Sequence, residues 1–348
     1  MKVKNINSVS NFKGKTVPDS SVTDKKVSEP KKGKKVKQFA KSTVGITAGA
    51  FTYKKVPDLL QKVLDQYIDW ACEGLKISKD NELLQVKNAV LDSFEKSGLK
   101  AKGFNLHNIN TADKIFSVND DMVKRADKIA SDRIKAIKEW LPEKLTNKIK
   151  SLSLKYFKRD PFEVKNNFAG DLAVVWQGKN AVCDPVLKDI ATNMDKTPAV
   201  TFHEMGHALN STKKLGKILQ SVRWPMQMVG VPLILATALL KRKKADGEKP
   251  KGFFDKTTTF IKNNAGKLSF AAFLPTLMEE GLADIRGLKL AKQAGLSSDF
   301  LKRMSVSNLK GWGTYLAAAT ISAVAVRLAV ALKDRIAEGK KNKIAAQK

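Results

Sequence analysis

Two of the three histidines in this 348-residue chain stand four positions apart, in the stretch TFHEMGHALN at residues 201–210. Side chains at positions i and i+4 lie on one face of an α-helix, so His203 and His207 are predicted to point toward one spot. Imidazoles at this spacing are a usual arrangement for holding a metal ion. Glu204 is expected to project beside that ion, where its carboxylate can act on a bound water.

A hydrolytic zinc site needs a third protein ligand and keeps one position open for water. The remaining histidine, His107, lies far upstream, so a carboxylate is the expected third ligand. The helical stretch EEGLADIRG offers Glu280 and Asp284, which are four residues apart and share a face. Glu280 is expected to bind the metal, while Asp284 accepts the N–H of a histidine and fixes its orientation.

Glu279 precedes Glu280 in the same helical turn, and the two must be told apart. Adjacent residues diverge by about 100° around a helix, so only one of them can face the metal. Ala283 follows four residues after Glu279 and offers no side-chain acceptor. Glu279 is therefore expected on a neighbouring face, where its removal leaves most of the metal binding and activity intact.

The combination of HExxH with a later helix bearing E-x-x-A-D resembles the gluzincin metallopeptidases. The nearest resemblance is to their membrane class, which includes the CAAX prenyl-protein proteases and the bacterial HtpX-like proteases. Apolar segments separate the two motifs in that class, and here 72 residues lie between the motifs, within a resemblance that spans residues 165–295. It implies a zinc endopeptidase with these roles: His203, His207 and Glu280 as zinc ligands, Glu204 as general base, and Asp284 as the supporting carboxylate.

The resemblance also implies one zinc per chain and hydrolysis of a peptide bond by a metal-activated water. An extended protein or peptide substrate would lie along an edge strand near Asn180–Cys183. Many gluzincins steady the oxyanion with a further histidine or tyrosine, but no histidine follows His207. Arg286 and Tyr315 are the candidates for that role, and Arg286 can equally pair with an acid on the helix surface.

The expected fold class is α+β and predominantly helical. It combines a zincin-like core, which has a short β-sheet, an active-site helix and a separate glutamate helix, with membrane-associated apolar helices. Four parts are expected along the chain: a disordered basic tail at 1–43, a helical region at 44–160, the metallopeptidase core at 161–300 with an apolar insert at 224–267, and an apolar helix with a basic tail at 301–348.

Hydrophobic periodicity and turn residues predict the individual elements. A loop is expected around His107, and Gly98 is expected to stop a helix. Two short strands are predicted at 172–176 and 180–183, where short apolar runs flank a glycine-containing turn. The predicted helices cover residues 57–75, 80–98, 119–141, 142–158 and 198–222.

Two apolar runs favour membrane association. The run 225–240 has 16 residues, or about 24 Å of helix, which falls short of the roughly 30 Å hydrocarbon layer. The run 311–332 has 22 residues and is long enough; its Arg327 lies near one end, where it can snorkel. The alternative is that these runs form alanine-rich core helices of a soluble domain.

The net charge of +30 favours anionic partners, and an anionic membrane is the expected one. Nucleic acid is disfavoured, because the sequence has no RNP, zinc-finger or P-loop motif. The N-terminus does not have the form of a secretory signal peptide, so a cytoplasmic catalytic side is expected. Lysine-rich segments flank both candidate sides of the membrane, however, so charge alone does not decide the orientation.

A second function remains open. The chain can be a non-catalytic scaffold that binds anionic membrane through its lysines and apolar helices, with a purely structural metal site. Glu204 separates the two hypotheses, because a structural site needs no acid there. Closed structural zinc sites also usually have four protein ligands, and the sequence shows no evident fourth ligand.

Overall fold

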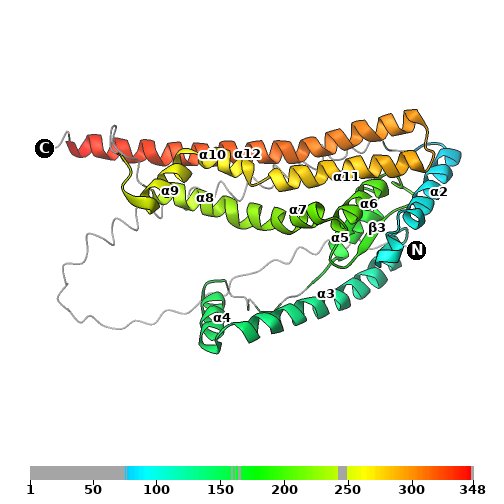
Figure 1. The fold of residues 1–348 in the computed structure, drawn as a ribbon, viewed down its shortest axis with the longest axis horizontal. Helices are drawn as coiled ribbons and strands as arrows, with labels where there is room; N and C mark the ends of the chain where they lie inside the picture. Colours follow the sequence, from blue (N-terminus) through cyan, green and yellow to red (C-terminus); the bar gives the residue numbers. More distant parts are fainter. Residues whose placement is uncertain are drawn as a thin grey trace, which may run out of the picture. The chain divides into compact units, whose positions relative to one another are not determined.

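The computed structural model describes residues 75, 77–157, 160, 162–163, 166–241 and 249–345 (Figure 1). These residues belong to one compact unit of the chain, residues 61–348. The basic tail at 1–43 and the helix expected from Pro57 lie outside the described residues. The described part is mostly helical with one three-stranded sheet, as predicted for a largely helical α+β chain.

Three helices open the described chain: α2 (Asp80–Lys96), α3 (Ala112–Trp140) and α4 (Glu143–Phe157). The stop at Gly98 is confirmed, since this glycine has a φ of 72° that other residues rarely adopt. Helix α3 begins seven residues earlier than expected, at Ala112 rather than at residue 119. The reason is that its buried face starts upstream of the predicted start, with Ile115 and Val118.

The sheet has the strand order β1-β3-β2 and consists of β1 (Asn105–Asn108), β2 (Val182–Asp184) and β3 (Asp189–Thr192). Strand β3 lies in the middle, parallel to β1 and antiparallel to β2. Strand β2 therefore forms an edge of the described sheet. It overlaps the strand predicted at 180–183 but starts two residues later.

The prediction of a loop around His107 is wrong, because this residue lies within β1. Its Nε2 lies 3.0 Å from Oδ1 of the buried Asp189, so it is a satisfied histidine and no part of the metal centre. Arg125 from α3 donates to the other carboxylate oxygen of Asp189. Strand β1 thus brings a piece of the 44–160 region into the same sheet as residues 182–192.

The strand predicted at 172–176 is also wrong, because these residues belong to helix α5 (Ala169–Trp176). Leu172 and Val175, three positions apart, share one face and pack into an apolar cluster with α3. The Asn167 side chain accepts the backbone N–H of Ala169 at the start of the helix. Burial at helical spacing therefore outweighs the β-propensity of the valines.

The single helix predicted at 198–222 is instead two helices, α6 (Val200–Ser211) and α7 (Lys214–Pro225). The chain turns at Lys213, whose backbone is extended. After the turn, Gly216 lies so close to the Asn210 carbonyl that a Cβ there would overlap it. This glycine allows α7 to pack against the end of α6.

Helix α7 continues through a π-helical segment, η2 (Met226–Gly230), into α8 (Val231–Leu240). The wider turn follows Pro225, which has no N–H for the helical ladder. Helices α9 (Gly252–Asn263), α10 (Ala265–Ala271) and α11 (Leu274–Gln293) come next. The chain ends in the long helix α12 (Ser298–Ala345). Helices α10 and α11 pack against both α7–α8 and α12 (Figure 1).

Two helical segments, Lys214–Leu240 and Ser298–Gly339, are long and apolar enough to cross a membrane. Only 6% and 17% of their most apolar windows are buried. Helices in the core of a soluble protein are usually covered by other elements, so this exposure is unusual for such helices.

Helices α6 and α11 approach each other at two glycines. A Cβ at Gly206 would overlap the Ala283 carbonyl oxygen, and one at Gly287 would come within 2.6 Å of the Phe202 carbonyl oxygen. Neither residue can therefore carry a side chain without moving a backbone. The motifs HEMGH and EEGLADIRG each contain one of these glycines, so their helices are held in direct contact.

We expect Gly206→Ala to separate α6 from α11, at a cost of about 1–3 kcal/mol, and to abolish metal binding. Gly170→Ala is the matched control, because Gly170 lies in α5 with open space where its Cβ would be. It should be neutral or stabilising by up to about 1 kcal/mol. Thermal unfolding and metal titration measure both effects. Equal metal affinity in the two variants would show that metal binding does not depend on the close approach of α6 and α11.

Candidate metal centre

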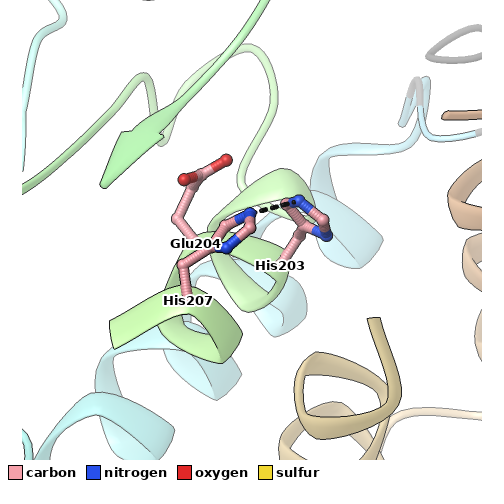
Figure 2. A group of neighbouring side chains, drawn as sticks. All are labelled: His203, Glu204 and His207. Atoms are coloured by element: carbon pink, nitrogen blue, oxygen red, sulfur yellow. Dashed lines mark hydrogen bonds between the residues drawn. The ribbon is translucent and has the colours of Figure 1, made fainter. Parts of the chain in front are cut away.

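Helices α6 and α11 bring three acceptor atoms to one point. The Nε2 atoms of His203 and His207 are 2.9 Å apart. Oε2 of Glu280 lies 3.4 Å from the first nitrogen and 3.3 Å from the second. Figure 2 shows the two imidazoles on one face of α6, with Glu204 beside them. The structure thus brings together the three residues that the sequence predicts as ligands.

The hydrogen bonds of the two Nδ1 atoms determine which ring nitrogen of each histidine carries the proton. Nδ1 of His203 lies 2.7 Å from Oδ1 of Asp284, and Nδ1 of His207 lies 2.8 Å from Oε1 of Glu279. Because carboxylates only accept hydrogen bonds, both Nδ1 atoms carry the proton and donate it. In the neutral rings, both Nε2 lone pairs then face each other and Glu280.

Oε2 of Glu280 is buried and has no hydrogen-bond donor. An unpaired buried carboxylate oxygen is costly, and here it lies beside two nitrogen lone pairs. With both Nδ1 atoms turned to carboxylates, the two Nε2 atoms and Oε2 of Glu280 need a proton or a metal ion between them. A proton can serve this purpose in the metal-free protein, and a metal ion satisfies all three atoms at once.

The dimensions of the acceptor triangle suit zinc. Two ligands at about 2.0–2.1 Å from a tetrahedral zinc stand about 3.3 Å apart. The three measured edges, 2.9, 3.3 and 3.4 Å, are close to this separation. Calcium and magnesium prefer oxygen ligands, whereas two imidazoles and one carboxylate are a common zinc set.

Glu204 lies beside the two histidines and is itself buried. Its carboxylate belongs to a group of candidate ligand atoms, with those of His203 and His207, that lie within 4.8 Å of one another. Burial raises the pKa of Glu204, while the two histidines oppose this increase. Such a carboxylate can take up a proton more readily than an exposed glutamate.

A cavity of about 310 Å³ opens onto these residues. Strand β2 borders it through Val182 and Cys183, and α12 borders it through Trp312 and Tyr315. A second cavity, of about 320 Å³, shares those β2 residues and has mostly apolar walls. Room for a ligand therefore exists beside the edge strand.

Glu279 is the main residue whose position the sequence analysis misjudged. It does not lie aside from the site: it is fully buried, and its Oε1 accepts from His207. Asn210 and Gln220 donate to the same oxygen. Helices α6 and α11 pair in opposite directions, so the later histidine meets the earlier carboxylate. Because Asp284 pairs with His203 and the helices run in opposite directions, the acceptor for His207 is expected about one turn before Asp284 on α11.

Arg223 on α7 is a second residue that the sequence analysis missed. Its Nη1 donates to Oε2 of Glu279 at 2.8 Å and lies 3.3 Å from Oε1 of Glu280. The guanidinium thus holds the second oxygens of both glutamates. The only feature of the sequence that could have pointed to Arg223 is its position just before the apolar run 225–240.

The two candidates for oxyanion stabilisation differ in their positions. Tyr315 lines the cavity, and its side chain interacts with Glu280. Arg286 donates to the Asn210 side chain and is not part of the cavity wall. Tyr315 is therefore the better placed of the two to contact a bound ligand.

No protein-family model, curated protein or solved structure matches this chain. The interpretation of the site therefore depends on its own geometry.

Zinc should stabilise the protein more as the pH rises from 6 to 9. Burial lowers the pKa of His207, but the Glu280 charge and the hydrogen bonds to Glu279 and Glu280 together outweigh burial and raise this pKa to about 9. Burial also lowers the pKa of His203. The interactions with Asp284 and Glu280 and the Glu204 charge together outweigh burial and raise this pKa well above its usual value. Raised histidine pKa values stabilise the zinc-free fold below about pH 6.5, and this stabilisation is lost as the pH approaches 9.

Zinc must displace these protons, so acid weakens its binding. The measurement is the difference in melting temperature between zinc-loaded and zinc-free protein across this range. A difference that stays constant, or narrows toward pH 9, would show that the histidines do not compete for zinc and protons.

Proposed function

We propose that this chain is a membrane-associated zinc endopeptidase of the gluzincin type. The observation that carries the proposal is the convergence of Nε2 of His203, Nε2 of His207 and Oε2 of Glu280, which lie 2.9, 3.3 and 3.4 Å from one another. Glu204 and an open cavity lie beside this point. A zincin-like core and peptidase activity are inferences from this arrangement and from the sequence motifs.

The residues of the chain have distinct roles in the proposed reaction. His203, His207 and Glu280 would hold the zinc, which would activate a water molecule and polarise the scissile carbonyl when bound. Glu204 accepts the proton of the attacking water and delivers it to the leaving amine. Asp284 and Glu279 hold the two imidazoles in the tautomer that leaves Nε2 free. The Tyr315 hydroxyl donates a hydrogen bond to the oxygen that gains charge.

Strand β2 is proposed to hold the substrate. It forms an edge of the described sheet, and Val182 and Cys183 line the cavity that contains the metal centre. An extended peptide can pair with such an edge through main-chain hydrogen bonds. The adjacent cavity, whose walls include Leu172 and Trp224, can take an apolar side chain of that peptide.

The membrane part of the proposal depends on the exposure of the two apolar segments. Their buried shares of 6% and 17% favour a lipid-facing role over the soluble-core alternative. A lysine-rich chain with a net charge of +30 suits a surface of anionic headgroups.

Cleavage of a fluorogenic peptide library by the purified, detergent-solubilised chain tests the enzymatic proposal. We expect hydrolysis that a zinc chelator stops and added zinc restores. A non-catalytic scaffold with a structural zinc site would bind zinc but cleave nothing. Cleavage that persists after complete removal of the metal would also reject the proposal.

A further inference from the structure

One cluster of charged side chains joins the end of α8, helix α9 and residues 333–334 of α12, away from the metal centre. Lys262 is buried, and its Nζ lies 2.7 Å from Oδ1 of Asp334 and 3.0 Å from the Lys241 carbonyl oxygen. Lys333 donates to the same carbonyl at 2.8 Å, and Lys241 pairs with Asp255. We refer to these five residues as the lysine–aspartate cluster.

Three segments connect this cluster to the metal centre, and all three have the same number of residues. Each runs over 18 sequence positions between a lysine of the cluster and a residue that lines the metal-centre cavity. At about 1.5 Å per residue, a continuous helix over 18 positions measures about 27 Å, close to the roughly 30 Å of a bilayer's hydrocarbon core. The segment from Lys262 to Glu280 is broken at Asn264 and at Ala272–Phe273, so it spans less. The segments are Arg223–Lys241, Lys262–Glu280 and Tyr315–Lys333.

The side chains between these ends are almost all uncharged. Residues 224–240 contain no charged residue. The other two segments contain Lys267 and Arg327, together with the buried Glu279 beside Glu280. Lys267 and Arg327 are exposed and lie five and six positions from the cluster. Both can therefore snorkel to the level of the cluster, at the same end.

Small residues hold the three segments together. Ala238, Ala265, Val326 and Val330 form a buried cluster of α8, α10 and α12. A Cβ at Gly266 would come within 2.8 Å of the Ala323 carbonyl oxygen, so α10 and α12 are in close contact there. Such packing is typical of helices within membranes. It leaves larger apolar side chains exposed: Leu233, Leu274, Met278, Val324 and Leu328.

Aromatic residues mark both ends of the segments. Trp224, Trp312 and Tyr315 lie at the metal-centre end, where the first of them is 61% exposed. Tryptophan and tyrosine are enriched at the headgroup level of bilayers. At the other end, α9 exposes Phe253 and Phe254, as an interfacial helix does.

We infer that these three segments cross a lipid bilayer together, with the lysine–aspartate cluster at one interface and the metal centre at the other. This inference rests on the proposed membrane association and refines it in two ways. First, α10–α11 forms a third, shorter crossing, interrupted at Ala272–Phe273. Second, the metal centre lies at a membrane surface and not at the bilayer midplane, so its cavity is accessible to water.

Spin-label depth measurements in vesicles of phosphatidylcholine and phosphatidylglycerol test this arrangement. Single cysteines are introduced at exposed positions of the full chain after replacement of Cys72 and Cys183, and circular dichroism confirms an unchanged helix content. Labels at Leu233 and Val324 lie near the middles of their segments. They should be deepest, roughly 15 Å inside the hydrocarbon boundary, and protected from an aqueous nickel relaxant.

A label at Leu274 should also be protected, although at a shallower depth, if α10–α11 crosses the bilayer. Labels at both ends of the crossings should lie near the interfaces: Trp224 and Leu316 at one end, Leu240 and Leu332 at the other. Leu84 on α2 serves as the exposed control in water.

Two results would overturn the inference. If labels at Leu233 and Val324 were as accessible to the nickel relaxant as the label at Leu84, the segments would not cross the bilayer. If the labels at Trp224 and Leu316 were the deepest of the set, the metal centre would lie inside the hydrocarbon layer. Because the readout needs neither zinc nor hydrolysis, failure of the enzymatic proposal would leave it unaffected.

Discussion

Glu204→Gln should lower peptide hydrolysis by about 10²- to 10⁴-fold while zinc binding stays at the wild-type level. Glutamine keeps the size of the side chain but cannot take up a proton from water. The Glu204 carboxylate lies beside the acceptor triangle and is not one of its three corners, so its loss leaves the ligands in place. Initial rates on one fluorogenic peptide and zinc content of the same preparation provide both measurements.

Glu95→Gln is the matched control, because Glu95 is an exposed glutamate that pairs only with Lys100 at the surface. It should change neither the rate nor the zinc content. Wild-type hydrolysis in the Glu204→Gln variant would show that another group acts as the base. Loss of zinc from this variant would instead make Glu204 a ligand.

Glu280→Ala should lose zinc and activity together. This substitution removes the only anionic corner of the acceptor triangle and leaves two imidazoles to hold the ion. It also removes the partner of Arg223 at 3.3 Å, but Glu279 still holds this guanidinium at 2.8 Å, so the fold should survive. Equilibrium dialysis with zinc measures the loss, and thermal unfolding checks that the protein remains folded.

Asp284→Asn provides a graded comparison for Glu280→Ala. Asparagine still offers an oxygen to Nδ1 of His203 but lacks the charge, so zinc affinity should fall by about 10- to 100-fold. The account would be wrong if Asp284→Asn lost all its zinc while Glu280→Ala retained it. The structure also changes the expectation for Glu279→Ala: it should weaken zinc binding and stability, because four donors, of which His207 and Asn210 are buried, would each lose an acceptor.

The sequence predicts two of the helices well, because their apolar residues recur over several turns. Helices α2 and α4 lie within one or two residues of their predicted ends, and Gly98 stops the first of them. Short elements were harder to predict, since a few apolar residues fit either a strand or a buried helical turn. Residues 172–176 form a helix because α3 offers a matching face, a tertiary contact that no local pattern reveals.

In the metal centre too, local spacing was predictable and contacts between helices were not. His203, His207 and Glu204 could be placed from helical spacing alone, because they share one helix. Predicting Glu279 and Arg223 required the relative direction of α6, α7 and α11, which the sequence does not specify. The glycines at 206 and 287 carry part of this information, because they are the points at which α6 and α11 make contact.

Metal analysis of the purified wild-type chain by inductively coupled plasma mass spectrometry tests the central claim most directly. The account predicts about one zinc per chain in protein purified without chelator, and the same stoichiometry when metal-free protein is reloaded. Glu280→Ala, purified in parallel, should contain almost none. A wild-type chain that stays metal-free after incubation with zinc at pH 8 would contradict the account, because its three converging acceptors would then hold only a proton.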